Sequence, residues 1–96
     1  MRAVEFTHTY KKQYKRLKRA GWNMDLLDHS VEVLLTEDVA ELERLWDHQL
    51  TGKKKAFREI HVGQRASDWV IEYEITEAGT VVLLLQTGSH NKVLGL

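Results

Sequence analysis

The sequence predicts an α+β fold in which an N-terminal strand and two to three helices pack on a mostly antiparallel sheet. Residues 7–45 place apolar side chains at helical spacing, whereas residues 56–87 hold three short apolar segments separated by turn residues. A short segment at residues 2–6 precedes the helices and predicts one further strand. We expect residues 1–96 to form a single domain, because a chain of this length can bury only one small core.

Each predicted helix has a polar capping residue at its start: Thr7 or Thr9, then Asn23, then Asp38. The first helix is expected to run to about Ala20, because Gly21 is a natural stop. The expected core-facing positions of the first two helices are Tyr10, Tyr14, Leu17, Leu27, Val31, Leu34 and Leu35. The short third helix would turn Val39, Leu42 and Leu45 inward.

Three strands are expected in the second half of the chain, at residues 56–62, 69–75 and 80–87. Glu77-Ala78-Gly79 is the expected turn between the last two strands. Residues 81–85 are apolar at every position, which is typical of an interior strand covered by helices. The three strands are expected to form an antiparallel meander.

The net charge is zero, but the charges are segregated along the chain. One basic block, on the first predicted helix, contains Lys11, Lys12, Lys15, Arg16, Lys18 and Arg19. The other follows the helices and contains Lys53, Lys54, Lys55, Arg58 and Arg65. Such blocks attract polyanions, although a solvated surface is the simpler interpretation of either block alone.

The absence of cysteine excludes disulfides and thiolate metal sites. No signal-peptide pattern is found near the start, and the apolar run 81–85 is far too short to cross a bilayer. We therefore expect a cytoplasmic protein without a membrane segment.

Three of the five histidines, His48, His61 and His90, fall near the ends of predicted strands, and Asp68 directly precedes one. In a meander, His61 and Asp68 then lie at the same edge of the sheet. RNA cleavage needs a general base, a general acid and cations near the phosphate, and histidine suits both proton-transfer roles. This chemistry requires no metal and no cofactor, and we predict none.

Other interpretations of the histidines are weaker. His8 and His29 are interpreted as exposed polar residues. Three histidines can also bind zinc, but the sequence has no H-x-x-x-H pair and no cysteine ligand.

Four segments occur in a recognisable order, at residues 47–52, 57–62, 68–73 and 87–90. They match the patterns D-H-x-L-x-G, aromatic-R-acid-x-H-V, D-W with an apolar strand ending in Tyr, and G-[ST]-H. Through these segments the chain resembles the YafQ-type branch of the RelE superfamily, the bacterial toxins of toxin–antitoxin pairs.

The resemblance implies a RelE-like α+β fold and cleavage of mRNA in the ribosomal A site. It implies three partners, namely a cognate antitoxin, the ribosome and mRNA. It assigns catalysis to His48, His61, Asp68 and His90, with the main proton transfers on His90 and Asp68. The helical basic block would contact ribosomal RNA, and the second basic block would contact the message. The alternative is a non-cleaving toxin of the same superfamily that binds ribosomes or inhibits gyrase.

The chain departs from the family pattern at three places. A longer loop, residues 63–67, separates Val62 from Asp68. Gln86 stands where an arginine is common, and Leu94 falls where family members carry a phenylalanine that contacts RNA. An aliphatic side chain cannot stack on a base, so these departures predict weaker activity or an altered codon preference.

Overall fold

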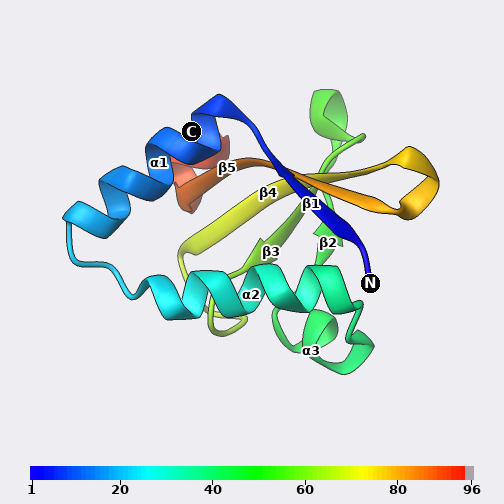
Figure 1. Cartoon of the computed structure of the whole chain (residues 1–96), viewed down its shortest axis with the longest axis horizontal. Coiled ribbons are helices and arrows are strands. Elements are labelled where there is room, and N and C mark those ends of the chain that lie inside the picture. The colour runs from blue at the N-terminus through cyan, green and yellow to red at the C-terminus, as the bar shows by residue number, and fades with distance from the viewer. Residues whose placement is uncertain (95–96) are drawn as a thin grey trace.

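The computed structural model describes the backbone of residues 1–94 and the side chains of residues 1–93. Its elements in chain order are β1 (Ala3–Phe6), α1 (His8–Arg19), α2 (Met24–Thr36), α3 (Val39–Arg44), β2 (His48–Gln49), a 3-10 turn (Gly52–Lys54), β3 (Arg58–His61), β4 (Trp69–Thr76), a second 3-10 turn (Glu77–Gly79), β5 (Val81–Ser89) and α4 (His90–Leu94) (Figure 1). The order of strands and helices confirms the predicted α+β class. Within the described residues, no helix is long and apolar enough to cross a membrane.

The five strands form one mixed sheet in the order β1-β5-β4-β3-β2. The predicted meander is confirmed, because β3, β4 and β5 pair antiparallel in succession. Strand β1 pairs parallel to β5, with Ala3 opposite Val81 and Phe6 opposite Leu84. Strand β5 therefore lies inside the sheet, as its apolar sequence predicts.

The helices begin where the sequence predicts. Thr7, Asn23 and Asp38 each accept a hydrogen bond from the backbone N–H three residues later, at 3.0, 3.4 and 3.2 Å. These side chains satisfy N–H groups that the first turn of a helix leaves without partners. Gly21 follows α1 with a positive φ of 83°, which suits a residue without a Cβ atom.

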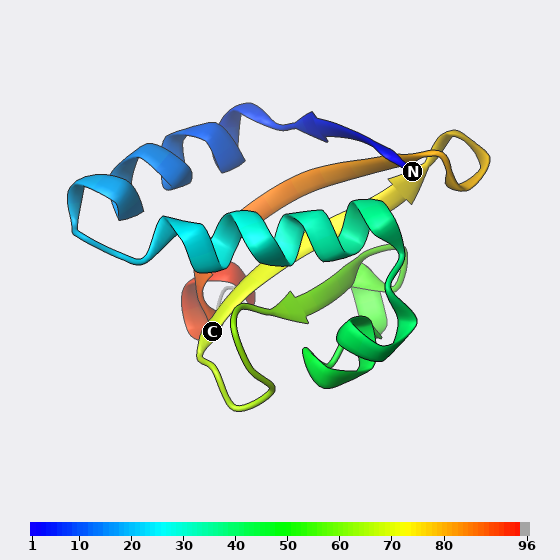
Figure 2. The ribbon, with the colours of Figure 1, turned by 60° about the horizontal axis from the view of Figure 1, so that its bottom comes forward.

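Helices α1 and α2 lie along one face of the sheet, and α4 lies behind it (Figure 2). Two neighbouring residues near the end of β5 contact these helices. The backbone N–H of Thr87 donates to the side chain of Gln13 on α1, whereas Gly88 faces Val93 of α4. The hydrophobic core between the sheet and the long helices includes Tyr10, Leu27, Val33, Leu34, Leu45, Ile60, Ile71, Tyr73, Val82 and Leu84.

The sequence did not predict two elements and misplaced some strand ends. Strand β2 has only two residues, and α4 has only five, so neither shows a periodic pattern. Strand β3 is shorter than the predicted 56–62, whereas β5 runs on to Ser89. The extension of β5 matters for the site, because α4 begins at the next residue, His90.

Replacing Leu34 with Ala is expected to lower the free energy of unfolding by about 2–5 kcal/mol, because Leu34 is 0% exposed and its loss leaves a cavity. The prediction that Val39 faces inward is wrong, because Val39 lies at the exposed start of α3 and is itself 75% exposed. Val39→Ala is therefore a suitable control, and its truncation is expected to change stability by less than about 0.5 kcal/mol. Urea unfolding measures both variants. Equal stability of Leu34→Ala and wild type would show that α2 does not pack as described.

Candidate active site

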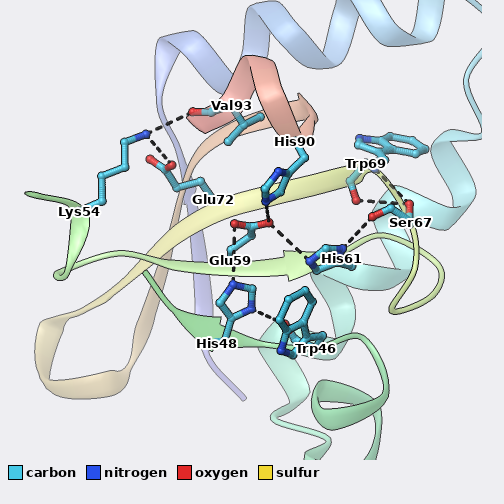
Figure 3. Close-up of polar contacts among 10 residues, drawn as sticks. All are labelled: Trp46, His48, Lys54, Glu59, His61, Ser67, Trp69, Glu72, His90 and Val93. Carbon is cyan, nitrogen blue, oxygen red and sulfur yellow. Dashed lines mark hydrogen bonds and ion pairs between the residues drawn. The ribbon is translucent and has the colours of Figure 1, made fainter. Parts of the chain in front are cut away.

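Three imidazoles from three separate elements meet beside the same buried carboxylate (Figure 3). Glu59 and His61 are two residues apart on β3, so their side chains point to the same face of the sheet. His48 lies directly opposite Glu59 on the neighbouring strand β2. His90 arrives from the first turn of α4, where its backbone N–H donates to the carbonyl oxygen of Asp68 at 2.7 Å.

Glu59 is the centre of this group, and its side chain is 0% exposed. Its Oε1 lies 3.2 Å from Nε2 of His90 and 3.5 Å from Nε2 of His61. Its Oε2 lies 3.9 Å from Nε2 of His48. Glu59 was not among the predicted site residues, although its i, i+2 spacing from His61 places both on one face of a strand.

The contacts around Glu59 are electrostatic. Among the described residues, neither carboxylate oxygen of Glu59 has a hydrogen-bond partner, and neither does Nε2 of His61. A buried carboxylate is costly unless positive charge lies beside it. The nearest groups that can carry that charge are the three imidazoles.

The backbone fixes the tautomers of two of the histidines. Nδ1 of His61 lies 2.7 Å from the carbonyl oxygen of Ser67, and Nδ1 of His48 lies 2.7 Å from that of Trp46. A carbonyl only accepts, so each Nδ1 carries the hydrogen, and Nε2 is the nitrogen that can gain or lose a proton. The side chains of His48 and His90 are 29% and 34% exposed, whereas that of His61 is 6% exposed. A substrate can therefore reach His48 and His90 more easily than His61.

The fourth predicted catalytic residue, Asp68, lies beside the cluster without joining it. Asp68 is exposed, and its carboxylate makes no hydrogen bond or ion pair with any other described residue. Its backbone carbonyl holds the start of α4 through the N–H of His90. The structure thus brings three of the four predicted catalytic side chains together, and leaves the Asp68 carboxylate facing solvent.

The lysines of the basic turn differ from one another, contrary to their grouping in the sequence. Nζ of Lys54 lies 3.0 Å from the buried Glu72 and donates to the carbonyl oxygen of Val93 in α4 at 3.2 Å. Lys53 and Lys55 are exposed. Lys54 therefore ties the turn to the helix that begins with His90, and only its two neighbours are fully available to an RNA phosphate.

Arg58 also differs from its prediction as an RNA contact. Its guanidinium binds Asp47 at 2.8 Å and lies 3.3 Å from the hydroxyl of Tyr73, which also donates to Asp47. The hydrogen bond to Asp47 raises the pKa of Arg58. Burial raises the pKa of Tyr73, and the nearby charge of Asp47 raises it further. Arg58 points to the opposite face of β3 from His61, so it stabilises the fold and does not meet the imidazoles.

The remaining predicted RNA contacts fall into three groups. Arg65 is exposed in the loop between β3 and β4, and its guanidinium lies over the ring of Trp46 at 4.9 Å. The side chain of Leu94 lies outside the described residues. All six basic residues of α1 are exposed, namely Lys11, Lys12, Lys15, Arg16, Lys18 and Arg19.

Trp46 follows the end of α3 in an unusual backbone conformation. Its N–H donates to Glu43 and the next N–H donates to Leu42, the two bonds of a Schellman motif. The φ angle of Trp46 is +54°, in the left-handed region that glycine normally occupies at this position. For a residue with a Cβ atom this conformation costs about 1–2 kcal/mol.

Solved structures of bacterial toxins share this fold. The metal-bound toxin from Helicobacter pylori is 30% identical, with a TM-score of 0.82 over 97% of this chain and 99% of its own. A chain of the Escherichia coli DinJ–YafQ toxin–antitoxin complex is 26% identical, with a TM-score of 0.80 over 98% of each chain. The fold is thus that of a class of small bacterial toxins.

The family described as the bacterial toxin of type II toxin–antitoxin system, YafQ, matches residues 2–95. The chain therefore belongs to the YafQ family of toxins, which confirms the resemblance found in the four sequence motifs. The mRNA interferase toxin YafQ of Escherichia coli strain K12 is 26% identical over 94 residues, or 98% of this chain and 97% of the relative. In the side chains described here, no group of three or more potential ligands has the geometry to hold a metal ion.

Proposed function

We propose that this toxin is a ribosome-dependent endoribonuclease that cleaves mRNA in the A site. The observation that carries the proposal is the convergence of three Nε2 atoms on the buried Glu59. This arrangement offers two accessible proton-transfer groups beside a buried carboxylate. The name of the Escherichia coli relative, an mRNA interferase, supports the same activity.

In the proposed reaction, a base takes the proton of a ribose 2′-OH, and the freed oxygen attacks the adjacent phosphorus. The bond to the 5′-oxygen breaks, and an acid protonates that oxygen as it leaves. The products are a 2′,3′-cyclic phosphate and a 5′-hydroxyl. His48 and His90 have Nε2 atoms near solvent and can take these roles, with His61 behind them. Asp68 is retained as a candidate for proton transfer, because it is exposed beside His90.

RNA contacts are proposed for the exposed cations around this site. Lys53, Lys55 and Arg65 would contact the message, and the basic face of α1 would contact ribosomal RNA. The protein would act in the cytoplasm, where ribosomes are found. A cognate antitoxin would hold it inactive, as the Escherichia coli DinJ–YafQ toxin–antitoxin complex suggests.

Primer extension on mRNA from cells that express the chain tests the proposal. Discrete cuts within translated codons, absent when translation initiation is blocked, are expected. Arrest of growth without any cut would instead indicate the non-cleaving toxin, which binds ribosomes or gyrase and leaves messages intact.

Neutralising Lys53 and Lys55 together is expected to weaken ribosome binding, because both are exposed and can contact phosphate. The slope of log affinity against log salt concentration should fall by an amount that corresponds to about two released counterions. Lys54→Gln is expected to behave differently. It breaks the contacts with Glu72 and Val93, so it lowers stability and misplaces α4. Binding isotherms at several salt concentrations, with melting curves, separate these effects. An unchanged salt slope in the Lys53/Lys55 variant would exclude the turn from the RNA-binding surface.

Cleavage is expected to survive removal of metal, because proton transfer and cationic side chains supply the proposed chemistry. Two toxins from Helicobacter pylori are described as metal-bound and copper-bound, so the point needs a direct test. The protein is treated with EDTA, dialysed, and assayed with magnesium restored for the ribosome. A loss of activity that only zinc or copper reverses would contradict the metal-independent mechanism.

A further inference from the structure

We propose that Trp46 and Arg65 form a subsite that binds one unpaired base of the RNA by stacking it on the indole. The inference rests on the proposed function, since it names where that substrate is held. Trp46 is 41% exposed and lies at the edge of the imidazole cluster. Single-stranded RNA is commonly recognised by stacking its bases on exposed aromatic rings.

One face of the indole already lies against the site. The ring centroid of Trp46 is 4.5 Å from that of His48 and 4.9 Å from that of His61, with near-parallel planes in both cases. The two imidazole centroids are only 6.1 Å apart, too close to lie on opposite faces of the indole. Both histidines therefore share one face of Trp46. The close-up shows the three rings next to one another (Figure 3).

Arg65 also lies over the indole, and because the two imidazoles occupy one face, we place its guanidinium on the other. Its guanidinium carbon lies 4.9 Å from the ring centroid, and the side chain is exposed. A planar guanidinium stacks on a base as readily as on an indole. A base can thus enter between Arg65 and Trp46 and be stacked on both sides. A nucleotide held there would lie next to the imidazole cluster, because His48 and His61 stack on the same indole.

The backbone at Trp46 supports a binding role. The left-handed conformation at φ +54° would be unstrained with glycine, yet this position has the bulkiest side chain. Trp46 does not belong to the hydrophobic core cluster. Glu37, Glu77 and Ala78 share this conformation, so what distinguishes Trp46 is that a large, exposed aromatic side chain is held there beside the imidazole cluster.

A thermodynamic cycle between the protein and the RNA tests the subsite. The ligands are short single-stranded RNAs that carry 2′-O-methyl groups to block cleavage, and each base is removed in turn. The affinity of the protein for each RNA is measured at equilibrium, once with free RNA and once with RNA bound to ribosomes. Trp46→Leu is expected to weaken binding of intact RNA about 5- to 150-fold. Trp46→Phe, which keeps an aromatic face, is expected to bind close to wild type. Phe6→Leu is the control, because Phe6 is an exposed aromatic on β1, at the far edge of the sheet from β2.

Removing one particular base is expected to weaken binding by wild type but not by Trp46→Leu. The proposal is overturned if no base shows such coupling. It is also overturned if Trp46→Leu slows cleavage without weakening RNA binding, because Trp46 would then only hold the imidazoles in place. Failure of the proposed function is a separate result, because it appears as a wild-type protein that leaves mRNA intact. The binding cycle does not depend on cleavage.

Discussion

His90→Ala is expected to lower the rate of mRNA cleavage by about 10²- to 10⁴-fold, the usual contribution of a general acid or base. Of the three imidazoles, that of His90 is the most exposed, at 34%, and its Nε2 lies 3.2 Å from the Glu59 carboxylate. The backbone N–H that bonds to Asp68 remains in the alanine variant, so α4 keeps its position. We therefore expect the loss to be catalytic, with ribosome binding retained.

Two neutral controls separate this effect from a loss of structure. His8→Ala removes an exposed imidazole at the start of α1, away from the cluster. Asn91→Ala alters the neighbouring exposed residue of α4. Both are expected to cut at the wild-type rate in single-turnover assays. A folded His90→Ala variant that remains toxic and cuts mRNA normally would contradict the assignment.

Glu59→Gln is expected to slow cleavage by about 10²- to 10³-fold, as the loss of a fixed charge at a reacting centre commonly does. Glutamine has nearly the same shape but no charge, so the three imidazoles lose the carboxylate that lies beside their Nε2 atoms. Removing a buried charge also removes a desolvation cost, so the fold is expected to remain stable. The expected signature is a lower kcat with little change in KM or melting temperature.

Glu59→Asp and Glu74→Gln complete this experiment. Aspartate keeps the negative charge on a shorter side chain, so it is expected to restore part of the activity. Glu74 lies half-buried on β4, and its neutralisation controls for the loss of one charge from the sheet. If Glu59→Gln melted early and its activity followed only the folded fraction, Glu59 would be a structural residue and not a positioning one.

Much of the fold could be predicted because local signals agree with the tertiary structure. The caps at Thr7, Asn23 and Asp38 and the apolar spacing of α2 are properties of a few neighbouring residues. Elements as short as β2 and α4 could not be predicted. Strand β2 exists because Gln49 pairs with Arg58, and α4 is held by contacts that are distant along the chain, from His90 to Asp68 and from Val93 to Lys54.

The candidate site could be predicted in its members but not in its geometry. Motifs pointed to His48, His61 and His90, and the structure places them together. Glu59 was overlooked because a carboxylate within a strand is usually solvated, and only its complete burial reveals its contacts with the imidazoles. Lys54 was predicted to contact RNA together with Lys53 and Lys55. Its ion pair could not be predicted, because its partner Glu72 lies on β4, distant along the chain.

The parallel pairing of β1 with β5 sets the order in which a newly made chain can complete itself. The partner of Ala3 is Val81, so the first strand stays unpaired until nearly the whole sequence has been synthesised. Contacts between residues so distant along the chain form late and slowly. His90 comes later still, just after that partner strand. A nascent chain therefore cannot assemble its imidazole cluster until translation is nearly complete.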